Sequence, residues 1–188
     1  MKKYILIAIF ISSLFAKDDS IYLDLNKTDY SDLRVFVGLD CGYRYQDNKD
    51  LSNKAYSYGI YAGIPLDGWD IIIKQKKNKS KDFDIFSNSI IANLDISGSG
   101  TDMTYFGILV GNSKLTLDNS IVINSNVTNN NQTETFYGTH IGHRYKFSRN
   151  FYVKIELEYI KYNFDIKSTD NLSIGDPIEF IYGIEYRF

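Results

Sequence analysis

The sequence predicts an all-β protein of eight antiparallel strands, and three observations support this fold class. Apolar and polar residues alternate with the two-residue period of a β-strand along most of the chain after residue 32. Short connections alternate with long connections between these segments. Aromatic residues make up 15% of the 188 residues, with 16 Tyr and 12 Phe, and such a content suits a barrel with aromatic girdles at both membrane interfaces.

The first 32 residues are predicted to stand apart from the strands. Residues 1–16 have the order of a secretory signal peptide: two lysines, a short apolar run and small residues that end at Ala16. The apolar run is shorter than the roughly 20 residues of a membrane-spanning helix, so we expect cleavage after Ala16 rather than anchoring. Residues 17–32 are polar and lack a strong period, and we expect them to form a periplasmic N-terminal segment.

Eight alternating segments follow, and most are close to the roughly 9 to 11 residues of a strand that crosses a bilayer at a tilt. Residues 151–159 show the pattern clearly, with Phe, Val, Ile, Leu and Tyr on one face and Tyr, Lys, Glu and Glu on the other. The alternation in residues 86–96 is weaker because Asn88 interrupts the apolar face. The predicted strands span residues 34–45, 56–64, 69–76, 86–96, 103–111, 137–145, 151–159 and 178–188.

The connections predict tight turns at one end of the barrel and longer loops at the other. Pro65, whose φ angle is restricted, and Gly68, whose backbone is permissive, mark the first turn. The longest connection, residues 112–134, is rich in Asn, Ser and Thr and contains an apolar patch at 115–123, so we expect a hairpin that extends outside the cell. The short connections are residues 65–68, 97–101 and 148–150, and the long ones are 46–53, 77–83, 112–134 and 165–176.

Aromatic residues on the apolar faces gather near the ends of the predicted strands, which is typical of girdles at two membrane interfaces. The girdle at the short-turn end is predicted to contain Trp69, Phe106, Tyr145 and Phe151. The girdle at the long-loop end is predicted to contain Tyr43, Tyr45, Tyr56, Tyr58, Tyr137 and Tyr159.

The last predicted strand, residues 178–188, has apolar or aromatic residues at every even position and ends the chain on Phe188. It resembles the closing strand of bacterial outer-membrane barrels, whose terminal pattern of polar-x-Gly-x-x-aromatic-x-aromatic is read by the barrel assembly machinery. Gly183, Tyr186 and Phe188 match this assembly signal, while Ile181 stands in place of the polar residue.

Taken over residues 33–188, the chain resembles the small eight-stranded outer-membrane β-barrel proteins typified by the OmpA transmembrane domain, OmpX and Ail. The resemblance implies an eight-stranded antiparallel transmembrane up-and-down β-barrel in the outer membrane of a Gram-negative bacterium, reached after export across the inner membrane. It further implies outer-membrane lipid and lipopolysaccharide as surroundings and the barrel assembly machinery as a partner during biogenesis. No cofactor is implied.

The inward faces of the predicted strands carry seven positive and seven negative residues, so their formal charges cancel. A matched set indicates ion pairs that fill the lumen, because an eight-stranded barrel is only wide enough for its own side chains. The positive residues are Arg34, Arg44, Lys74, Lys76, Arg144, Lys154 and Arg187, and the negative ones are Asp40, Asp70, Asp95, Glu156, Glu158, Glu179 and Glu185. From strand heights we predict a cluster of Arg144, Lys154, Glu156 and Glu185, including a Lys154–Glu185 pair, with His140 against Glu158.

The sequence gives little support for catalysis or metal binding. His140 and His143 are three residues apart on one strand and face opposite sides, so they cannot share a metal ion. His143 faces outward as in the outer-membrane lipid A deacylases, but Tyr145 stands where their motif has Ser. Glu156 and Glu158 are a possible carboxylate pair, although two such residues on a lumen wall beside cations are more often structural.

Three functions are consistent with these features. The first and preferred one is a structural or surface-interaction protein whose extracellular loops meet a ligand that the sequence does not identify. The second is a narrow channel or small-solute-binding barrel. The third is a soluble lipocalin-like periplasmic barrel with its apolar face inward. The formal net charge of -2 gives no footprint for nucleic acid.

Overall fold

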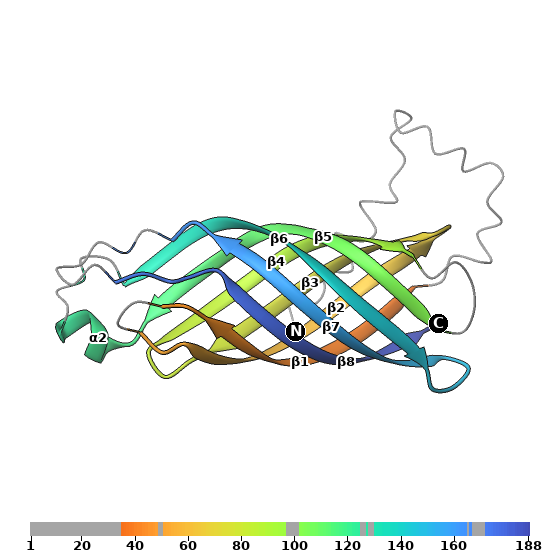
Figure 1. Ribbon diagram of the computed structural model, residues 1–188, viewed down its shortest axis with the longest axis horizontal. Helices are drawn as coiled ribbons and strands as arrows, with labels where there is room; N and C mark the ends of the chain where they lie inside the picture. Colours follow the sequence, from red (N-terminus) through yellow and green to blue (C-terminus); the bar gives the residue numbers. More distant parts are fainter. Residues whose placement is uncertain are drawn as a thin grey trace, which may run out of the picture. The chain divides into compact units, whose positions relative to one another are not determined.

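Eight antiparallel strands form a closed barrel in sequence order in the computed structural model (Figure 1). The chain divides into residues 1–33 and 34–188, and the structure describes residues 35–48, 51–96, 102–124, 127, 130–164, 166 and 172–188, all within the second part. The predicted signal peptide (1–16), N-terminal segment (17–32) and turn at 97–101 lie outside the described residues. The strands are β1 (Phe36–Gln46), β2 (Lys54–Leu66), β3 (Trp69–Lys79), β4 (Phe83–Asp95), β5 (Met103–Leu117), β6 (Asn131–Lys146), β7 (Phe151–Tyr162) and β8 (Pro177–Arg187).

The pairing register fixes how the barrel is wound. Following Cα partners once around the barrel from Ile64 leads back to Lys54 on the same strand, a shift of ten residues, through Ile71, Ala92, Ile108, Thr139, Tyr159, Ile178 and Tyr45. Such a stagger requires strands that tilt by roughly 35–45° from the barrel axis. Inward side chains at one height therefore come from residues that are not direct partners in the ladder.

The wall of the barrel is apolar outside and charged inside. The exposed outer positions include Leu39, Ile60, Ile71, Ile90, Ile108, Ile141, Ile155 and Ile184, whereas Asp40, Asp70, Lys74, Lys154, Glu156 and Glu185 are buried in the lumen. A soluble lipid-binding barrel has the opposite arrangement. Continuous exposed apolar surface of this kind is typical of a membrane contact.

The turn between β2 and β3 is tighter than predicted. Pro65 and Leu66 are already paired with Asp70 and Trp69, so the turn contains only Asp67 and Gly68. Gly68 has a φ of 73°, a backbone conformation that residues with a Cβ seldom adopt.

Two predicted loops are shorter than expected because strands continue into them. The predicted loop at 77–83 is reduced to three residues, since β3 runs to Lys79 and β4 begins at Phe83. The predicted loop at 112–134 loses both ends, because residues 112–116 pair with residues 131–135. Figure 1 shows this long β5–β6 hairpin at the end opposite to the C-terminus.

A short helix, α2 (Asn119–Asn124), lies in the connection between β5 and β6. Asp118 caps it, because its side chain accepts hydrogen bonds from the hydroxyl and the backbone N–H of Ser120 at 2.7 and 2.9 Å. These bonds lower the pKa of the Asp118 carboxyl. In the described part of the chain, no helix is long and apolar enough to cross a membrane.

Candidate functional site

The lumen contains all six residues of the predicted charge cluster. His140 and Arg144 come from β6, Lys154, Glu156 and Glu158 from β7, and Glu185 from β8. Each has a relative exposure of 3% or less. Inward direction follows from strand parity, which is why the sequence could place these side chains.

Near the short-turn end, Arg144 is the centre of the network. Its guanidinium forms an ion pair with Asp70 of β3, and its Nε lies 3.4 Å from Oε2 of Glu185. The guanidinium carbon also lies 4.5 Å from the centroid of the Tyr105 ring. Strands from opposite sides of the barrel are therefore joined through one arginine.

At mid-height, Lys74 and Lys154 share Asp40. The two ammonium nitrogens lie 2.7 and 3.0 Å from the Asp40 carboxylate. Lys74 also lies 3.7 Å from Glu156 and 3.7 Å from Glu158, so one ammonium lies within ion-pair distance of three carboxylates. The predicted cluster omitted Lys74 and Asp40, because shear brings β1 and β3 side chains to the height of β7.

The layer above contains Lys76, which bridges Glu158 and Glu179. Its ammonium forms an ion pair with Glu158 and lies 3.0 Å from Oε2 of Glu179. The hydroxyl of Ser57 donates to the other Glu179 oxygen. Arg44 lies beyond this layer and donates from Nη1 to the Tyr162 hydroxyl at 3.1 Å.

One predicted pair is wrong. Arg144 is the Cα partner of Lys154, and His140 is the partner of Glu158, but Lys154 lies opposite Gly183 and Glu185 lies opposite Tyr152. The error arises because Phe151 pairs with Tyr186 and not with Phe188. The last two residues of the chain therefore extend beyond the start of β7, and each inward residue of β8 is displaced by two positions along β7. Lys154 pairs with Asp40 and Glu156 instead of Glu185.

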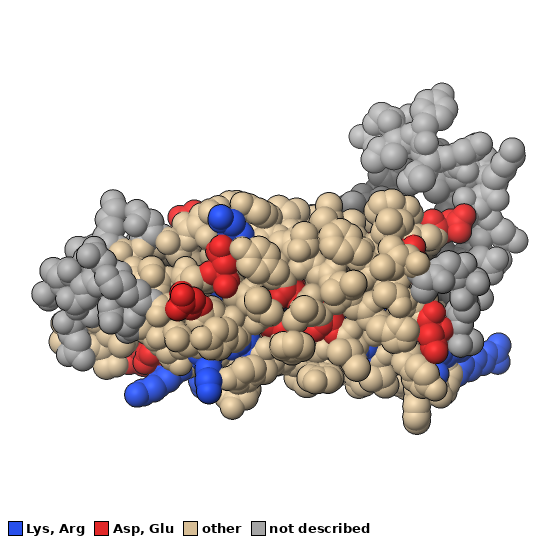
Figure 2. Space-filling model, in the orientation of Figure 1, with Lys and Arg blue, Asp and Glu red and all other residues tan. Residues whose placement is uncertain are grey.

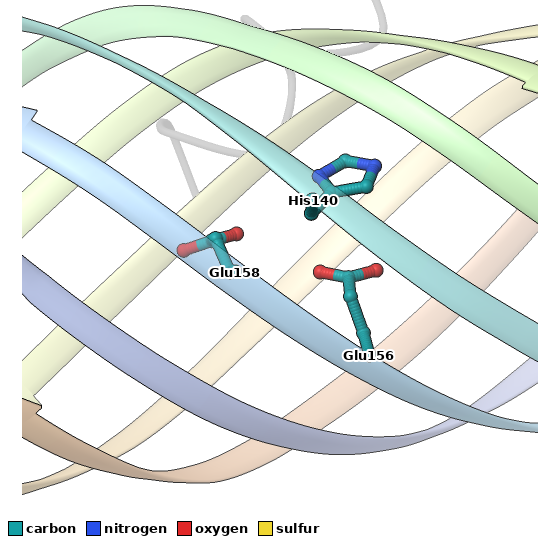
Figure 3. Close-up of side chains that lie close together, drawn as sticks. All are labelled: His140, Glu156 and Glu158. Atoms are coloured by element: carbon teal, nitrogen blue, oxygen red, sulfur yellow. The ribbon is translucent and has the colours of Figure 1, made fainter.

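His140, Glu156 and Glu158 converge on one point in the lumen, as Figure 3 shows. Their potential ligand atoms all lie within 4.8 Å of one another. The two carboxylates are already neutralised by Lys74, Lys76 and Lys154, and a divalent cation would have to displace ammonium groups. Nε2 of His140 lies 2.6 Å from the Asn93 side-chain oxygen. The charges and hydrogen bonds therefore favour a structural network over a metal centre.

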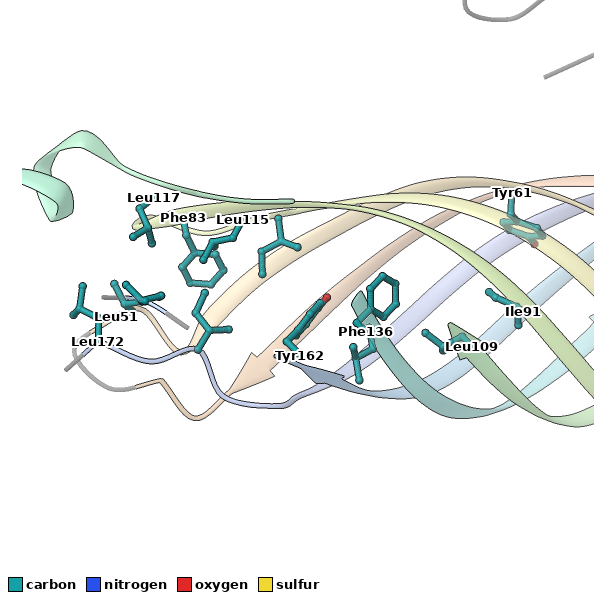
Figure 4. Close-up of a cluster of buried hydrophobic side chains, with 14 of the residues drawn as sticks. Leu51, Tyr61, Phe83, Ile91, Leu109, Leu115, Leu117, Phe136, Tyr162 and Leu172 are labelled. Carbon is teal, nitrogen blue, oxygen red and sulfur yellow. The ribbon is translucent and has the colours of Figure 1, made fainter. Parts of the chain in front are cut away.

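The long-loop end of the lumen is filled by an apolar cap that the sequence analysis missed (Figure 4). We use this name for buried inward residues of the strand ends together with residues of the loops above them. The strands supply Phe83, Ile85, Leu115, Leu117, Phe136, Ile160 and Tyr162, and the loops supply Leu51, Val127, Ile166, Leu172 and Ile174. The available signal was the inward apolar set of Phe83, Ile85, Leu115 and Leu117, which stood in predicted loops or beyond the predicted strand ends.

The ten predicted girdle residues all face outward and are exposed. Trp69, at 50%, belongs to the short-turn end, and Tyr56, at 70%, belongs to the long-loop end. Neighbouring rings also touch, since Tyr43 and Tyr56 pack edge to face with centroids 5.7 Å apart. The outer wall therefore presents aromatic side chains toward both ends of the apolar belt.

The three residues of the predicted assembly signal have different surroundings. The Tyr186 ring packs between Phe151 and Phe188, with both centroid distances at 4.9 Å. The backbone N–H of Phe188 donates to the carbonyl of Val35 at 3.0 Å. A Cβ on Gly183 would overlap the Asp40 carboxylate and come within 2.7 Å of Cε of Lys154, so the Asp40–Lys154 pair itself requires glycine there.

Deleting Phe188 is expected to lower the yield of folded barrel in the outer membrane, because the deletion removes both the terminal aromatic residue and a hydrogen bond that helps to join the C-terminus to β1. The measurement is the fraction of heat-modifiable protein in outer-membrane extracts. Phe188→Tyr, which keeps an aromatic terminus, serves as the control and should behave as wild type. An unchanged yield after the deletion would contradict the predicted assembly signal.

One pair of side chains on the outer face combines a histidine with a hydroxyl group, as catalytic sites do. Nδ1 of His143 lies 2.9 Å from the Thr104 hydroxyl on the exposed face of β5 and β6. A catalytic triad would also need a carboxylate that orients the histidine, and among the described residues the His143 ring forms its hydrogen bond with Thr104. The pair is best explained as a cross-strand hydrogen bond.

Comparison with known proteins adds evidence at the level of the fold. No protein-family model and no curated protein matches the sequence. Among solved structures, the chain is similar to Neisserial surface protein A, NspA, with 17% identity and a TM-score of 0.67 over 82% of this chain and 97% of that one. It is also similar to OprG from Pseudomonas aeruginosa, with 13% identity and a TM-score of 0.54 over 83% and 96% of the two chains.

A third similar structure is Ail of Yersinia pestis in complex with the heparin analogue sucrose octasulfate. The identity is 15% and the TM-score 0.53, over 82% of this chain and 97% of that one. All three are small eight-stranded outer-membrane barrels, and this chain also forms a closed barrel of eight strands. The fold of this chain is therefore that of the small eight-stranded outer-membrane β-barrel proteins.

Proposed function

We propose that this protein is a non-conducting outer-membrane barrel with a structural or surface-interaction role, and that its extracellular loops form the interaction surface. The proposal rests on the observation that two groups of buried side chains fill the lumen. Buried ion pairs occupy its lower and middle parts, and the apolar cap occupies the long-loop end. A channel needs a continuous water-filled path, and the buried side chains of both parts stand in the way of such a path among the described residues.

The same proposal assigns no enzymatic activity to the chain. Lysines and arginines pair with the lumen carboxylates, and the outward His143 forms a hydrogen bond with the Thr104 hydroxyl. The proposed surroundings are outer-membrane lipid and lipopolysaccharide, with the barrel assembly machinery as a partner during biogenesis. The assembly signal at Gly183, Tyr186 and Phe188 supports the second of these partners.

In planar bilayers the wild-type protein is expected to show no steady conductance. Folded protein is inserted and single-channel currents are recorded, and a trimeric porin inserted in the same bilayers provides the positive comparison. A steady, ion-selective current through the wild-type protein would replace the surface-interaction proposal by the channel alternative.

The loop proposal is tested by exchanging residues 118–130 for a short Gly/Ser linker. This exchange removes Val127 from the apolar cap but retains the paired ends of β5 and β6, and with them Leu115 and Leu117. We expect the variant to fold and to lose adhesion of expressing cells to immobilised sulfated glycan, the class of ligand present in the Ail complex. Asp67→Asn in the turn at the opposite end, which keeps Gly68, is the control. Unchanged adhesion of the loop variant would contradict a role for this loop.

A further inference from the structure

A lysine-rich run on β3 is divided between two surfaces by the period of the strand. Residues 74–81 read Lys-Gln-Lys-Lys-Asn-Lys-Ser-Lys. Lys74 and Lys76 point into the lumen, where each neutralises buried carboxylates. Lys77 and Lys79 have the opposite parity and lie on the outer wall, and Lys81 is exposed in the turn that follows. The ion-pair network explains the first two lysines but not the other three.

The outward lysines form one patch with Lys54 of β2. Lys77 and Lys79 are the Cα partners of Tyr58 and Tyr56, and Lys54 is the partner of Tyr45. A hydrogen bond of 2.9 Å from the Ser80 hydroxyl to the Lys54 carbonyl ties the turn after β3 to the start of β2. We call Lys54, Lys77, Lys79 and Lys81 the β2–β3 basic patch. It adjoins the tyrosine girdle at the long-loop end.

The patch retains free positive charge. Lys77 forms a half-exposed ion pair of 2.8 Å with Asp84. The carboxylate of Asp82, the other acidic residue of this turn, accepts the backbone N–H of Ser52 at 2.7 Å. Within the described ranges, Lys54, Lys79 and Lys81 have no ion-pair partner, and all three side chains are exposed. Figure 2 shows Lys and Arg side chains gathered near the end of the barrel that carries α2.

The position of the patch coincides with the upper boundary of the apolar belt. On β5 the outer face changes from Ile108 and Val110 to Lys114, while the inner face becomes apolar at Leu115. On β3 the outer face changes in the same way from Ile71 to Lys77 and Lys79. An outer face that turns from apolar to basic marks the level at which hydrocarbon gives way to headgroups.

We propose that the β2–β3 basic patch binds the phosphate groups of a phosphorylated glycolipid in the outer leaflet. This inference rests on the proposed function only in placing the long-loop end outside the cell. Lysine side chains reach along the wall to the headgroup level and act as point charges for phosphate. The girdle rings of Tyr45, Tyr56 and Tyr58 lie directly beside them and provide contact with the sugar and the upper acyl chains.

The position of the lysines favours a lipid over a soluble polyanion. Three of the four are fixed on the side wall by strand pairing, next to aromatic residues, rather than at the tips of the extracellular loops. Side chains on a barrel wall point into the surrounding bilayer, so their natural partner is a headgroup in the leaflet. A sulfated polysaccharide in solution would meet the loop tips first.

The test compares lipid binding of the mature, folded protein and two variants by native mass spectrometry in detergent. The first variant is Lys54→Gln/Lys79→Gln/Lys81→Gln, and the probes are diphosphorylated lipid A and the same lipid after removal of both phosphates. Each lysine near a charged membrane surface strengthens binding roughly fivefold. Three lysines are replaced, and even if each contributes only part of this effect, we expect the triple variant to bind diphosphorylated lipid A at least about tenfold more weakly.

The control is Lys146→Gln/Arg149→Gln, which removes two cations at the short-turn end, where β6 ends and the turn to β7 follows. It should change lipid binding less than about twofold, since both residues lie at the opposite end of the barrel from the patch. The proposal is overturned if both variants bind equally, if the dephosphorylated lipid binds as tightly, or if the triple variant loses binding to soluble heparin but retains lipid A. Conductance of the same variants is recorded separately, so that an open lumen and a missing lipid site give different results.

Discussion

Replacing Lys74 with methionine is expected to destabilise the barrel by about 3 to 5 kcal/mol, because the change removes one cation from among three buried carboxylates. Lys74 lies 2.7 Å from Asp40 and 3.7 Å from both Glu156 and Glu158. Methionine has a similar length, so the main change is electrostatic. Lys154 and Lys76 remain as partners of these carboxylates, but Lys154 is already shared between Asp40 and Glu156, and Lys76 between Glu158 and Glu179.

The free energy of unfolding is measured by urea titration of protein folded into lipid vesicles, with the fluorescence of Trp69 as the signal. Trp69 is the only tryptophan and lies half-exposed on the outer wall, away from Lys74 at mid-height. The unfolding reaction is followed in both directions to establish equilibrium. Only a two-state transition permits the free energies to be compared.

The same strand provides the control, Lys77→Met. Lys77 faces outward and forms its ion pair with Asp84 at a half-exposed site, where such pairs contribute about 1 kcal/mol or less. The two variants make the same chemical change three residues apart on opposite faces of β3. Equal and small losses would indicate that water reaches the charges of the lumen, and the proposal of a closed barrel would then fail as well.

The sequence predicts the membrane part of the fold well because two environments act on each strand. Lipid outside and a charged lumen inside impose alternation, and this is why residues 151–159 and 178–188 could be assigned with their correct faces. The terminal aromatic residue and the Asp67-Gly68 turn are also determined by short stretches of sequence. In these parts of the chain, the residue type at each position agrees with its place in the fold.

Prediction was less successful above the membrane, where the alternation reverses its phase. In β5 the outer residues Ile108 and Val110 give way to Lys114, and the inner residues become Leu115 and Leu117. Water outside and the apolar cap inside require this exchange. The alternation of apolar outer and polar inner residues stops at this level, so the sequence pattern predicts a loop at residues 112–117 where the strand in fact continues.

The ion pairs could be predicted only in part, because parity and register are different kinds of information. Parity is written in each strand and places Glu156 and Lys154 in the lumen. Register depends on how far each strand slides against the next, and the ten-residue stagger accumulates over eight such steps. It brings Asp40 of β1 and Lys74 of β3 to Glu156 of β7, which no single stretch of sequence reveals.

Replacing Phe136 with alanine is expected to cost about 3 to 5 kcal/mol, comparable with the loss of a buried charge partner but for another reason. Phe136 is 1% exposed, and its ring lies within the apolar cap with its centroid 5.5 Å from that of the Tyr162 ring. The rigid wall of paired strands cannot collapse around the missing ring, so a cavity remains. Urea titration with Trp69 fluorescence again measures the effect.

Phe86→Ala is the matched control for this cavity. Phe86 lies on the outer face of β4 with 39% exposure, and its removal leaves space that surrounding lipid or detergent can fill. Its loss should therefore be clearly smaller than that of Phe136→Ala, because the cavity contribution is absent. Similar losses in the two variants would indicate that the cap is loosely packed and that Phe136 stabilises the barrel no more than a membrane-facing residue does. Loose packing at that end would also remove the apolar cap as one of the two barriers that close the lumen, the other being the buried ion pairs. A current through Phe136→Ala but not through Phe86→Ala would locate the main barrier at the cap.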